Sequence, residues 1–271
     1  MEFYKTLELI LEAKDKEKKL QLFDVFYKEY LQNGVVFESS YEAKHFEEPS
    51  YSEICTIVPP QEVPKRSNLT KKEGQINLLH AVVHIEYSAI DLALDAAYRF
   101  HHLPKAYYDD WLRVADDEVR HFRMLEALLK DLGASYGDVA VHNALFEASQ
   151  KTQTLVERMA VVPRYLEANG LDATPMILQK LRRLPYDTMI QNIIDNLEVI
   201  LEEEIDHVKK GDRWFAYAVQ HAGVEKSIYF EIIQKYYPRG FLRPNDLNIE
   251  ARKEAGFSCS ELKVMAKKEV C

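Results

Sequence analysis

The chain has 271 residues, 47 % of them apolar, with 44 acidic against 35 basic side chains and a formal net charge of −9. This length and apolar content predict a folded globular protein and exclude a disordered one. The acidic balance argues against a broad surface for nucleic acid or anionic lipid, because affinity for phosphate comes from clustered cations. The uncharged stretches are shorter than a membrane-spanning helix, and residues 1–20 lack the apolar core of a secretory signal. We therefore expect a cytoplasmic protein that does not enter the membrane.

Cysteine and glycine usage narrows the fold class. The three cysteines, Cys55, Cys259 and Cys271, are odd in number and form no CxxC pair, so we expect neither a zinc site nor a disulfide framework. Only 9 residues are glycine, and the apolar residues recur mostly at helical spacing. The sequence therefore predicts an all-α fold in a reduced compartment.

Residues 1–69 divide into a helical part and an extended part. Apolar and charged residues alternate with a helical period over residues 3–31, which predicts one or two amphipathic helices with one buried stripe. Residues 34–68 contain several prolines and short β-branched runs, which favour an extended segment over a helix. We interpret residues 1–69 as an N-terminal helical arm followed by a Pro-containing extended segment.

Four long helical stretches follow in residues 70–223. The Thr70-Lys71-Lys72-Glu73 segment has the pattern of a capping box, and Gly133 and Asn169-Gly170 are candidate caps at the ends of the second and third stretches. The four expected helices cover residues 71–102, 105–132, 137–168 and 186–222. We expect them to form a four-helix bundle, with the shorter helices of residues 224–271 packed on it.

Two Glu-x-x-His tetrads carry the chemistry, Glu118 to His121 on the second helix and Glu204 to His207 on the fourth. Residues three apart project from the same side of a helix, so each tetrad offers a carboxylate and an imidazole to one point. Four-helix proteins that bind a metal pair use this geometry, with one further Glu from each of the other two helices. The two tetrads therefore predict a site for two metal ions.

Both tetrads lie within apolar stripes, where a carboxylate is costly unless it is paired or coordinated. Glu86, on the first helix, has the same surroundings, with Val82, Val83 and Ile90 on its face. Glu86 is therefore the expected ligand from the first helix. Around these ligands, we considered several residues that could orient the imidazoles. They are His80, His84, Asp91, Asp195 and Asp206.

The third helix offers two candidate ligands, Glu157 and Glu167. The neighbours of Glu157 on its face are mostly polar, whereas Glu167 follows Val156, Met159 and Ala160, so we favour Glu167. Its predicted place in the last helical turn is unfavourable for an anion, because the negative end of the helix dipole lies there. A metal ion or the Arg164 guanidinium would offset that cost.

The ligand order Glu, Glu-x-x-His, Glu, Glu-x-x-His resembles that of the ferritin-like superfamily. More narrowly, the chain is similar to an uncharacterised bacterial ferritin-like family over residues 58–257, although that family has Arg at the position of Asn169. The segments that carry the resemblance are HIE at 84–86, AIDLALD at 89–95, DEVRHF at 117–122, VPRYLEANGLD at 162–172 and EEIDHVKKGDRWF at 203–215. The resemblance implies a ferritin-like four-helix bundle with a non-haem metal pair. Iron is the preferred ion, with manganese or a mixed Fe/Mn pair as alternatives.

From these observations we expect an oxidoreductase in which a metal pair activates dioxygen or a peroxide to oxidise an organic substrate. The expected ligands are Glu86, Glu118, His121, Glu167, Glu204 and His207. The superfamily suggests a small molecule or a modified nucleoside as substrate, and an oxygenase would also need an electron donor. Iron oxidation or peroxide detoxification is one alternative. A helical scaffold that holds metal only for stability is another.

Overall fold

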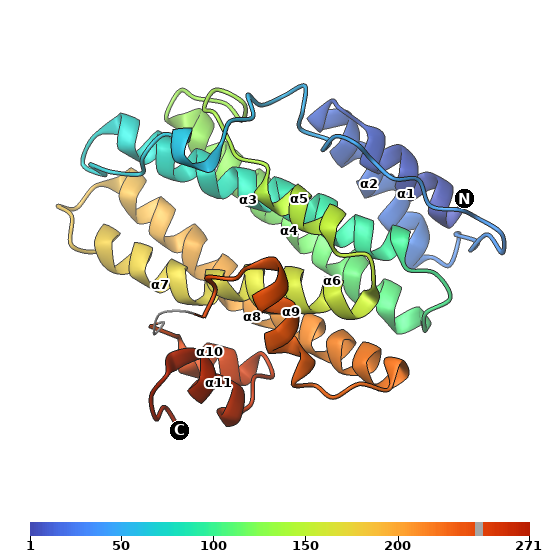
Figure 1. Cartoon of the computed structure of the whole chain (residues 1–271). Helices are drawn as coiled ribbons and strands as arrows, with labels where there is room; N and C mark the ends of the chain where they lie inside the picture. Colours follow the sequence, from blue (N-terminus) through green and yellow to red (C-terminus); the bar gives the residue numbers. More distant parts are fainter. Residues whose placement is uncertain (242–245) are drawn as a thin grey trace. The chain divides into compact units, whose positions relative to one another are not determined.

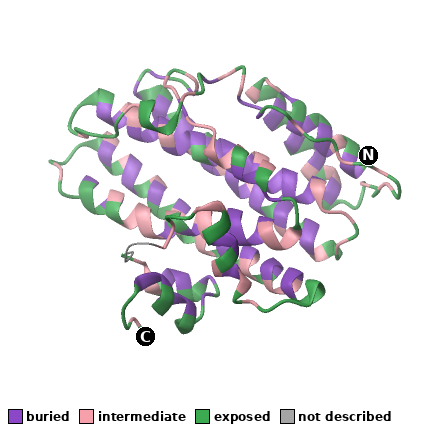
Figure 2. Cartoon of the chain, viewed as in Figure 1, coloured by how far each residue is buried: buried purple, intermediate pink, exposed green. Residues whose placement is uncertain are grey.

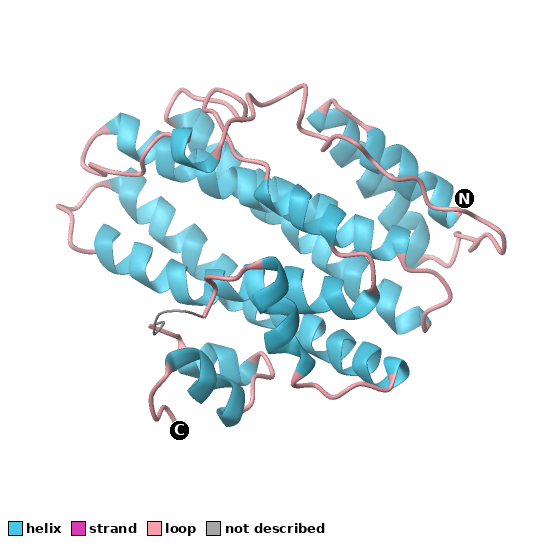
Figure 3. Ribbon diagram, in the orientation of Figure 1, coloured by secondary structure: helices cyan, strands magenta, loops and turns pink. Residues whose placement is uncertain are grey.

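The computed structural model describes residues 1–241 and 246–271, and within these ranges the chain is all-α, as predicted. Figure 3 shows helices joined by loops, and the described residues contain isolated bridges but no strand. None of the described helices combines the length and apolar character needed to cross a bilayer. The contacts divide the chain into two compact units, residues 1–146 and 147–271. The domain boundaries that the sequence analysis placed after residues 69 and 223 stay predictions.

The first unit begins with the two amphipathic helices expected from the sequence, α1 (Phe3–Glu12) and α2 (Lys16–Leu31). Each helix has buried and exposed residues, as Figure 2 shows, and Phe3, Phe23 and Phe26 are fully buried. The fully buried ammonium of Lys19 pairs with the Asp91 carboxylate, which also accepts a hydrogen bond of 2.6 Å from Ser50 Oγ. Because an unpaired buried charge is costly, this pair fixes how the arm lies against α3.

The helices α3 (Lys72–Arg99) and α4 (Lys105–Asp131) form an antiparallel hairpin and lie side by side in Figure 1. Their bounds agree with the predicted 71–102 and 105–132 to within a few residues. Gly133 has a φ of 71°, in the left-handed region, and ends the hairpin as predicted.

The predicted capping box at Thr70 is wrong. The Thr70 hydroxyl donates to Asn68 Oδ1 at 3.0 Å, and α3 begins without a side-chain cap. The turn before the helix passes so close that a Cβ on Gly74 would lie 2.4 Å from the carbonyl oxygens of Ser67 and Asn68. The preceding segment is not α-helical, as its prolines indicate: it is mostly extended, with turns at residues 50–55 and a short 3₁₀ turn, η1 (Pro60–Glu62).

The third predicted helix, at residues 137–168, is wrong in its bounds. The structure has α5 (Ala144–Lys151), α6 (Leu155–Val161), a π-helix η2 (Val162–Glu167) and α7 (Ala168–Leu181). A true capping box between Thr154 and Glu157 starts α6. Pro163 lacks the N–H that a regular α-helix would use, which explains why the α pattern changes there to a π turn. The helix then continues through Asn169-Gly170 instead of ending there.

The second unit is organised around α8 (Thr188–Ala222), which agrees closely with the predicted 186–222. It begins at an Asp187 cap and ends at Gly223, whose φ is 68°. The segments α6, η2 and α7 pack along it. The described residues after α8 include three short helices, α9 (Ile228–Tyr236), α10 (Ile249–Glu254) and α11 (Cys259–Ala266).

The sequence predicts no disulfide framework, but the described residues contain one disulfide that the sequence did not predict. Cys259, at the start of α11, is bonded to Cys271, with the two Cα atoms 5.9 Å apart, whereas Cys55 is free and buried. Lys267 ends α11 in the left-handed conformation, with a φ of 52°, and this turn returns the chain toward the start of the helix. Spacing along the sequence contains no information about such a turn.

Candidate metal centre

The first half-site consists of Glu86 on α3 and of Glu118 and His121 on α4. All three side chains are buried, and each offers a ligand atom within 4.8 Å of the others. His121 Nδ1 lies 3.2 Å from Glu86 Oε2 and 3.5 Å from Glu118 Oε2. The structure therefore brings together three of the side chains that the sequence pattern singled out.

Local helix geometry explains this arrangement. Glu118 and His121 are one turn apart and so project from the same side of α4. The faces that they share with Glu86 are otherwise apolar, and burying these faces drives the hairpin together. The buried neighbours are Val83, Ala89, Ile90, Val114, Ala115, Phe122 and Leu125. Packing the apolar stripes of α3 and α4 thus forces the three polar side chains into one interior site.

The charges of the first half-site are coupled. Burial by itself lowers the pKa of the His121 imidazole, but Glu118 and Glu86, through hydrogen bonds and charge, raise that pKa to about 11. Without a metal, the two carboxylates thus favour the charged form of the His121 imidazole. A divalent cation at this position would replace the proton, because a coordinating imidazole must be neutral.

The second half-site is the tetrad on α8, where His207 Nδ1 lies 3.6 Å from Glu204 Oε1. His207 is fully buried, and the side chain of Glu204 is 15 % exposed. The helical spacing brings this pair together as it does on α4. The two half-sites belong to different compact units, so a joint site of all the predicted ligands stays a prediction.

Glu167 is the last residue of η2. A Cβ on Gly211 of α8 would lie 2.2 Å from Pro163 Cβ, so η2 and α8 are in direct contact at these residues. The segment η2–α7 runs antiparallel to α8, because Arg182, just after α7, pairs with Glu198 in the first third of α8. One turn onward from Pro163 and one turn back from Gly211 therefore place Glu167 and His207 at the same level along the two helices. Because α7 continues the helix, Glu167 is not in a terminal turn, and the expected dipole cost is absent.

Glu157, the alternative ligand from the same region, has other partners. It accepts from Thr154 in the capping box, pairs with Lys235 Nζ at 2.7 Å and accepts from the Tyr236 hydroxyl at 2.7 Å. Burial raises the pKa of Glu157, but Lys235, Tyr236 and the capping contact together lower it below its ordinary value. Glu157 thus joins α6 to α9.

The residues considered as orienting groups have partners of their own. Asp91 holds Lys19 and Ser50, Asp195 accepts from the Gln191 amide at 2.7 Å, and Asp206 pairs with Lys210 one turn along α8. Each of these contacts stabilises a helix or its docking. The described contacts of these three aspartates are therefore not with the predicted metal ligands.

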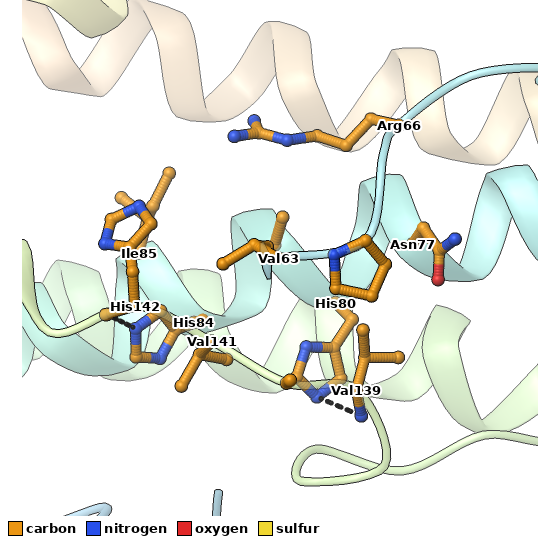
Figure 4. Close-up of a pocket in the computed structure, with 12 residues that line it drawn as sticks. Val63, Arg66, Asn77, His80, His84, Ile85, Val139, Val141 and His142 are labelled. Carbon is orange, nitrogen blue, oxygen red and sulfur yellow. Dashed lines mark hydrogen bonds between the residues drawn. The ribbon is translucent and has the colours of Figure 1, made fainter. Parts of the chain in front are cut away.

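His80 and His84 instead line a small pocket of about 30 Å³ in the first unit (Figure 4). His80 Nε2 accepts the backbone N–H of Gly137 at 2.9 Å, and His84 Nε2 donates to the His142 carbonyl at 3.0 Å. His84 Nδ1 accepts from the Tyr136 hydroxyl at 3.0 Å. These contacts fix both rings as neutral tautomers that bind the loop after α4 to α3.

Comparison with known proteins gives one family. A family model described as "Protein of unknown function (DUF455)" matches residues 12–263. An "Uncharacterized protein" of Haemophilus influenzae is 41 % identical over 222 residues, which cover 79 % of this chain and 75 % of that protein. No solved structure matches the chain. Because the model covers nearly the whole chain and the relative is this similar, the chain belongs to the family described as "Protein of unknown function (DUF455)".

Proposed function

We propose that this protein is a ferritin-like oxidoreductase that binds two metal ions, preferably iron, and oxidises an organic substrate with dioxygen or a peroxide. The observation that carries the proposal is the buried group of Glu86, Glu118 and His121. Buried carboxylates beside an imidazole form a donor set of oxygen and nitrogen that suits first-row metal ions. The second tetrad and Glu167 supply the remaining ligands.

When bound, the metal pair would supply the electron-transfer chemistry, and the protein would supply the binding site. Glu86, Glu118, Glu167 and Glu204 would offset the charge of the cations, and a carboxylate can bind one ion or bridge two. His121 and His207 would complete the ligand set as neutral rings. Because His121 is fully buried, the packed α3–α4 hairpin would also keep bulk water from this side of the site.

Two alternatives remain open. The same ligands could oxidise ferrous iron or remove peroxide, in which case no organic substrate is needed. They could also hold a metal that only stabilises a helical scaffold. An organic substrate would give turnover that consumes the oxidant and requires an electron donor, whereas a scaffold would show metal binding without turnover.

Metal stoichiometry tests the proposal directly. Protein prepared without oxygen and loaded with Fe(II) is expected to hold close to two ions per chain and to change its optical spectrum when air is admitted. Glu118→Gln, which keeps the side-chain shape but removes the charge, is expected to lose metal. Fe(II) binding far below one ion per chain by the wild-type protein would refute the proposal.

Glu126→Gln is the matched control. Glu126 is a buried glutamate on the same helix, but it pairs with Lys16 and Lys130. Its replacement should lower the melting temperature without changing the metal content. Equal metal loss in both variants would mean that Glu118 acts only through stability.

A further inference from the structure

Arg164 is a fully buried cation three residues before Glu167 in η2. Its Nε forms an ion pair with Asp212 Oδ1 at 2.8 Å, and its Nη2 donates to Glu261 Oε1 at 2.8 Å. Arg164 and these two carboxylates are named the Arg164 cluster below. The guanidinium thus binds two carboxylates from segments far apart in sequence.

Three aromatic rings surround the guanidinium. Its central carbon lies 4.8 Å from the ring centroid of Phe215, 4.4 Å from that of Tyr229 and 4.6 Å from that of Phe257. The Tyr229 hydroxyl also donates to the backbone carbonyl of Arg164 at 3.1 Å. Buried cation–π contacts and paired charges at these distances hold the side chain in one position.

The Arg164 cluster connects η2 to both α8 and the C-terminal helices. Asp212 directly follows Gly211, which receives Pro163, and lies beyond His207 on α8. Glu261 lies on α11 and also caps that helix through Ser258. The cluster therefore fixes the register between the segment that carries Glu167 and the helix that carries Glu204 and His207.

A π turn needs such support. Its backbone geometry is rarer than that of the α-helix, and π segments persist mostly where surrounding contacts or function require them. If η2 relaxed toward an α turn, the side chains after Pro163 would rotate about the helix axis. The Glu167 side chain, at the end of the π turn, would then move away from its position level with His207 along α8.

We infer that the Arg164 cluster positions Glu167 for metal binding, and that α11, through Glu261, is part of the support of the metal site. This inference rests on the proposed function. Arg164 is a positioning residue, because it acts through the π turn. The C-terminal helices thereby acquire a role that the ligand pattern does not include.

The test uses Glu261→Gln in the full chain, with Co(II) as the probe. The variant keeps the side-chain shape but removes the charge that faces Arg164. Loss of a group that orients a metal ligand weakens binding by about 10–100-fold. We therefore expect the second Co(II) equivalent to bind 10–100-fold more weakly, with an altered visible spectrum. In the metal-free protein, amide exchange over residues 162–167 should become faster.

Asp172→Asn is the matched control. Asp172 binds Arg252, another buried arginine, at 2.6 Å, and the central guanidinium carbon of Arg252 lies 5.0 Å from the centroid of the Phe257 ring. This pair joins α10 to α7, and Arg252 Nη2 also donates to the Ala168 carbonyl at 3.0 Å. The control therefore removes a charge from a second buried arginine–carboxylate pair near the end of η2, while the pairs of Arg164 with Asp212 and Glu261 stay in place. Loss of the Asp172 charge should lower the melting temperature without changing the Co(II) spectrum.

The outcomes separate the two ideas. A wild-type protein that binds no Co(II) would overturn the proposed function and, with it, the role of Glu167. Two bound Co(II) ions with the same affinity and spectrum in Glu261→Gln would overturn only the positioning role. Unchanged amide exchange over residues 162–167 would show that the cluster does not hold the π turn, whatever the metal result.

Discussion

At the residue scale, burial and neighbouring charges together set the pKa values of the buried histidines. Two carboxylates beside His121 raise its pKa against the effect of burial, whereas the effect of burial prevails at His80. Burial lowers the pKa of His80 to about 4, although the charge of Asp138 acts in the opposite direction. Two histidines on neighbouring helices of one hairpin thus have pKa values shifted in opposite directions because their partners differ.

His80→Gln should reduce the loss of stability in mild acid. Because the folded pKa is below the ordinary value of 6.5, neutral His80 contributes full stability above pH 6.5, and the contribution is lost as the pH falls toward about 4. Between pH 7.5 and pH 5 this is worth on the order of 1–2 kcal/mol. A Gln amide oxygen can still accept the Gly137 N–H. Urea unfolding at both pH values measures the difference, and an identical pH dependence in both proteins would contradict it.

Replacement by alanine should have opposite effects on stability at two glycines of the second unit. A Cβ on Gly211 would meet Pro163, so Gly211→Ala should destabilise the protein by about 1–3 kcal/mol. A Cβ on Gly170 would meet nothing within 4 Å, and its place inside α7 predicts a gain of about 0.5–1 kcal/mol. Melting curves test both. Destabilisation by Gly170→Ala would mean that the helix ends there after all.

At the scale of elements, the ends of helices depend on contacts that a local pattern does not contain. The Thr70-Lys71-Lys72-Glu73 segment has the letters of a capping box but not its geometry, whereas Thr154 and Ser258 form complete capping boxes. The long helices with apolar stripes, α3, α4 and α8, were predictable almost to the residue. The interrupted region α5–α7 was not, because Pro163 permits a π turn in place of a break.

Removal of the Thr154 hydroxyl and of the Thr70 hydroxyl should therefore have unequal effects on stability. Thr154→Ala loses two hydrogen bonds at the start of α6 and should cost about 0.5–2 kcal/mol. Thr70→Ala loses only a hydrogen bond to Asn68 and should change the free energy of unfolding by less. Denaturant unfolding of both variants compares a threonine that caps a helix in the structure with one that only has the sequence pattern of a cap. Equal losses would favour the capping box that the sequence suggested at Thr70.

At the scale of the whole molecule, the described contacts give two compact units, and the C-terminal segment is closed by a disulfide. The bond joins residues 12 apart and encloses α11, which carries Glu261. A covalent closure of this kind limits the unfolded chain and so supports the helix.

Cys271→Ala should lower the stability of the oxidised protein by up to about 3 kcal/mol. In the presence of a reductant, the variant and the wild-type protein should unfold alike, because both then lack the bond. Thermal unfolding with and without reductant makes the comparison. Identical melting temperatures without reductant would show that the disulfide does not stabilise the folded chain.

The sequence alone determined the all-α class, the bounds of the long helices and the grouping of Glu86 with Glu118 and His121. These features follow from periodicity, because burying an apolar stripe requires a helix and the stripe itself carries the polar residues into the interior. Only the tertiary structure decided the π turn before Ala168, the partners of Glu157 and the contacts of Arg164 with Asp212 and Glu261. Those features depend on segments distant in sequence, and pairing between distant segments leaves no local period to detect.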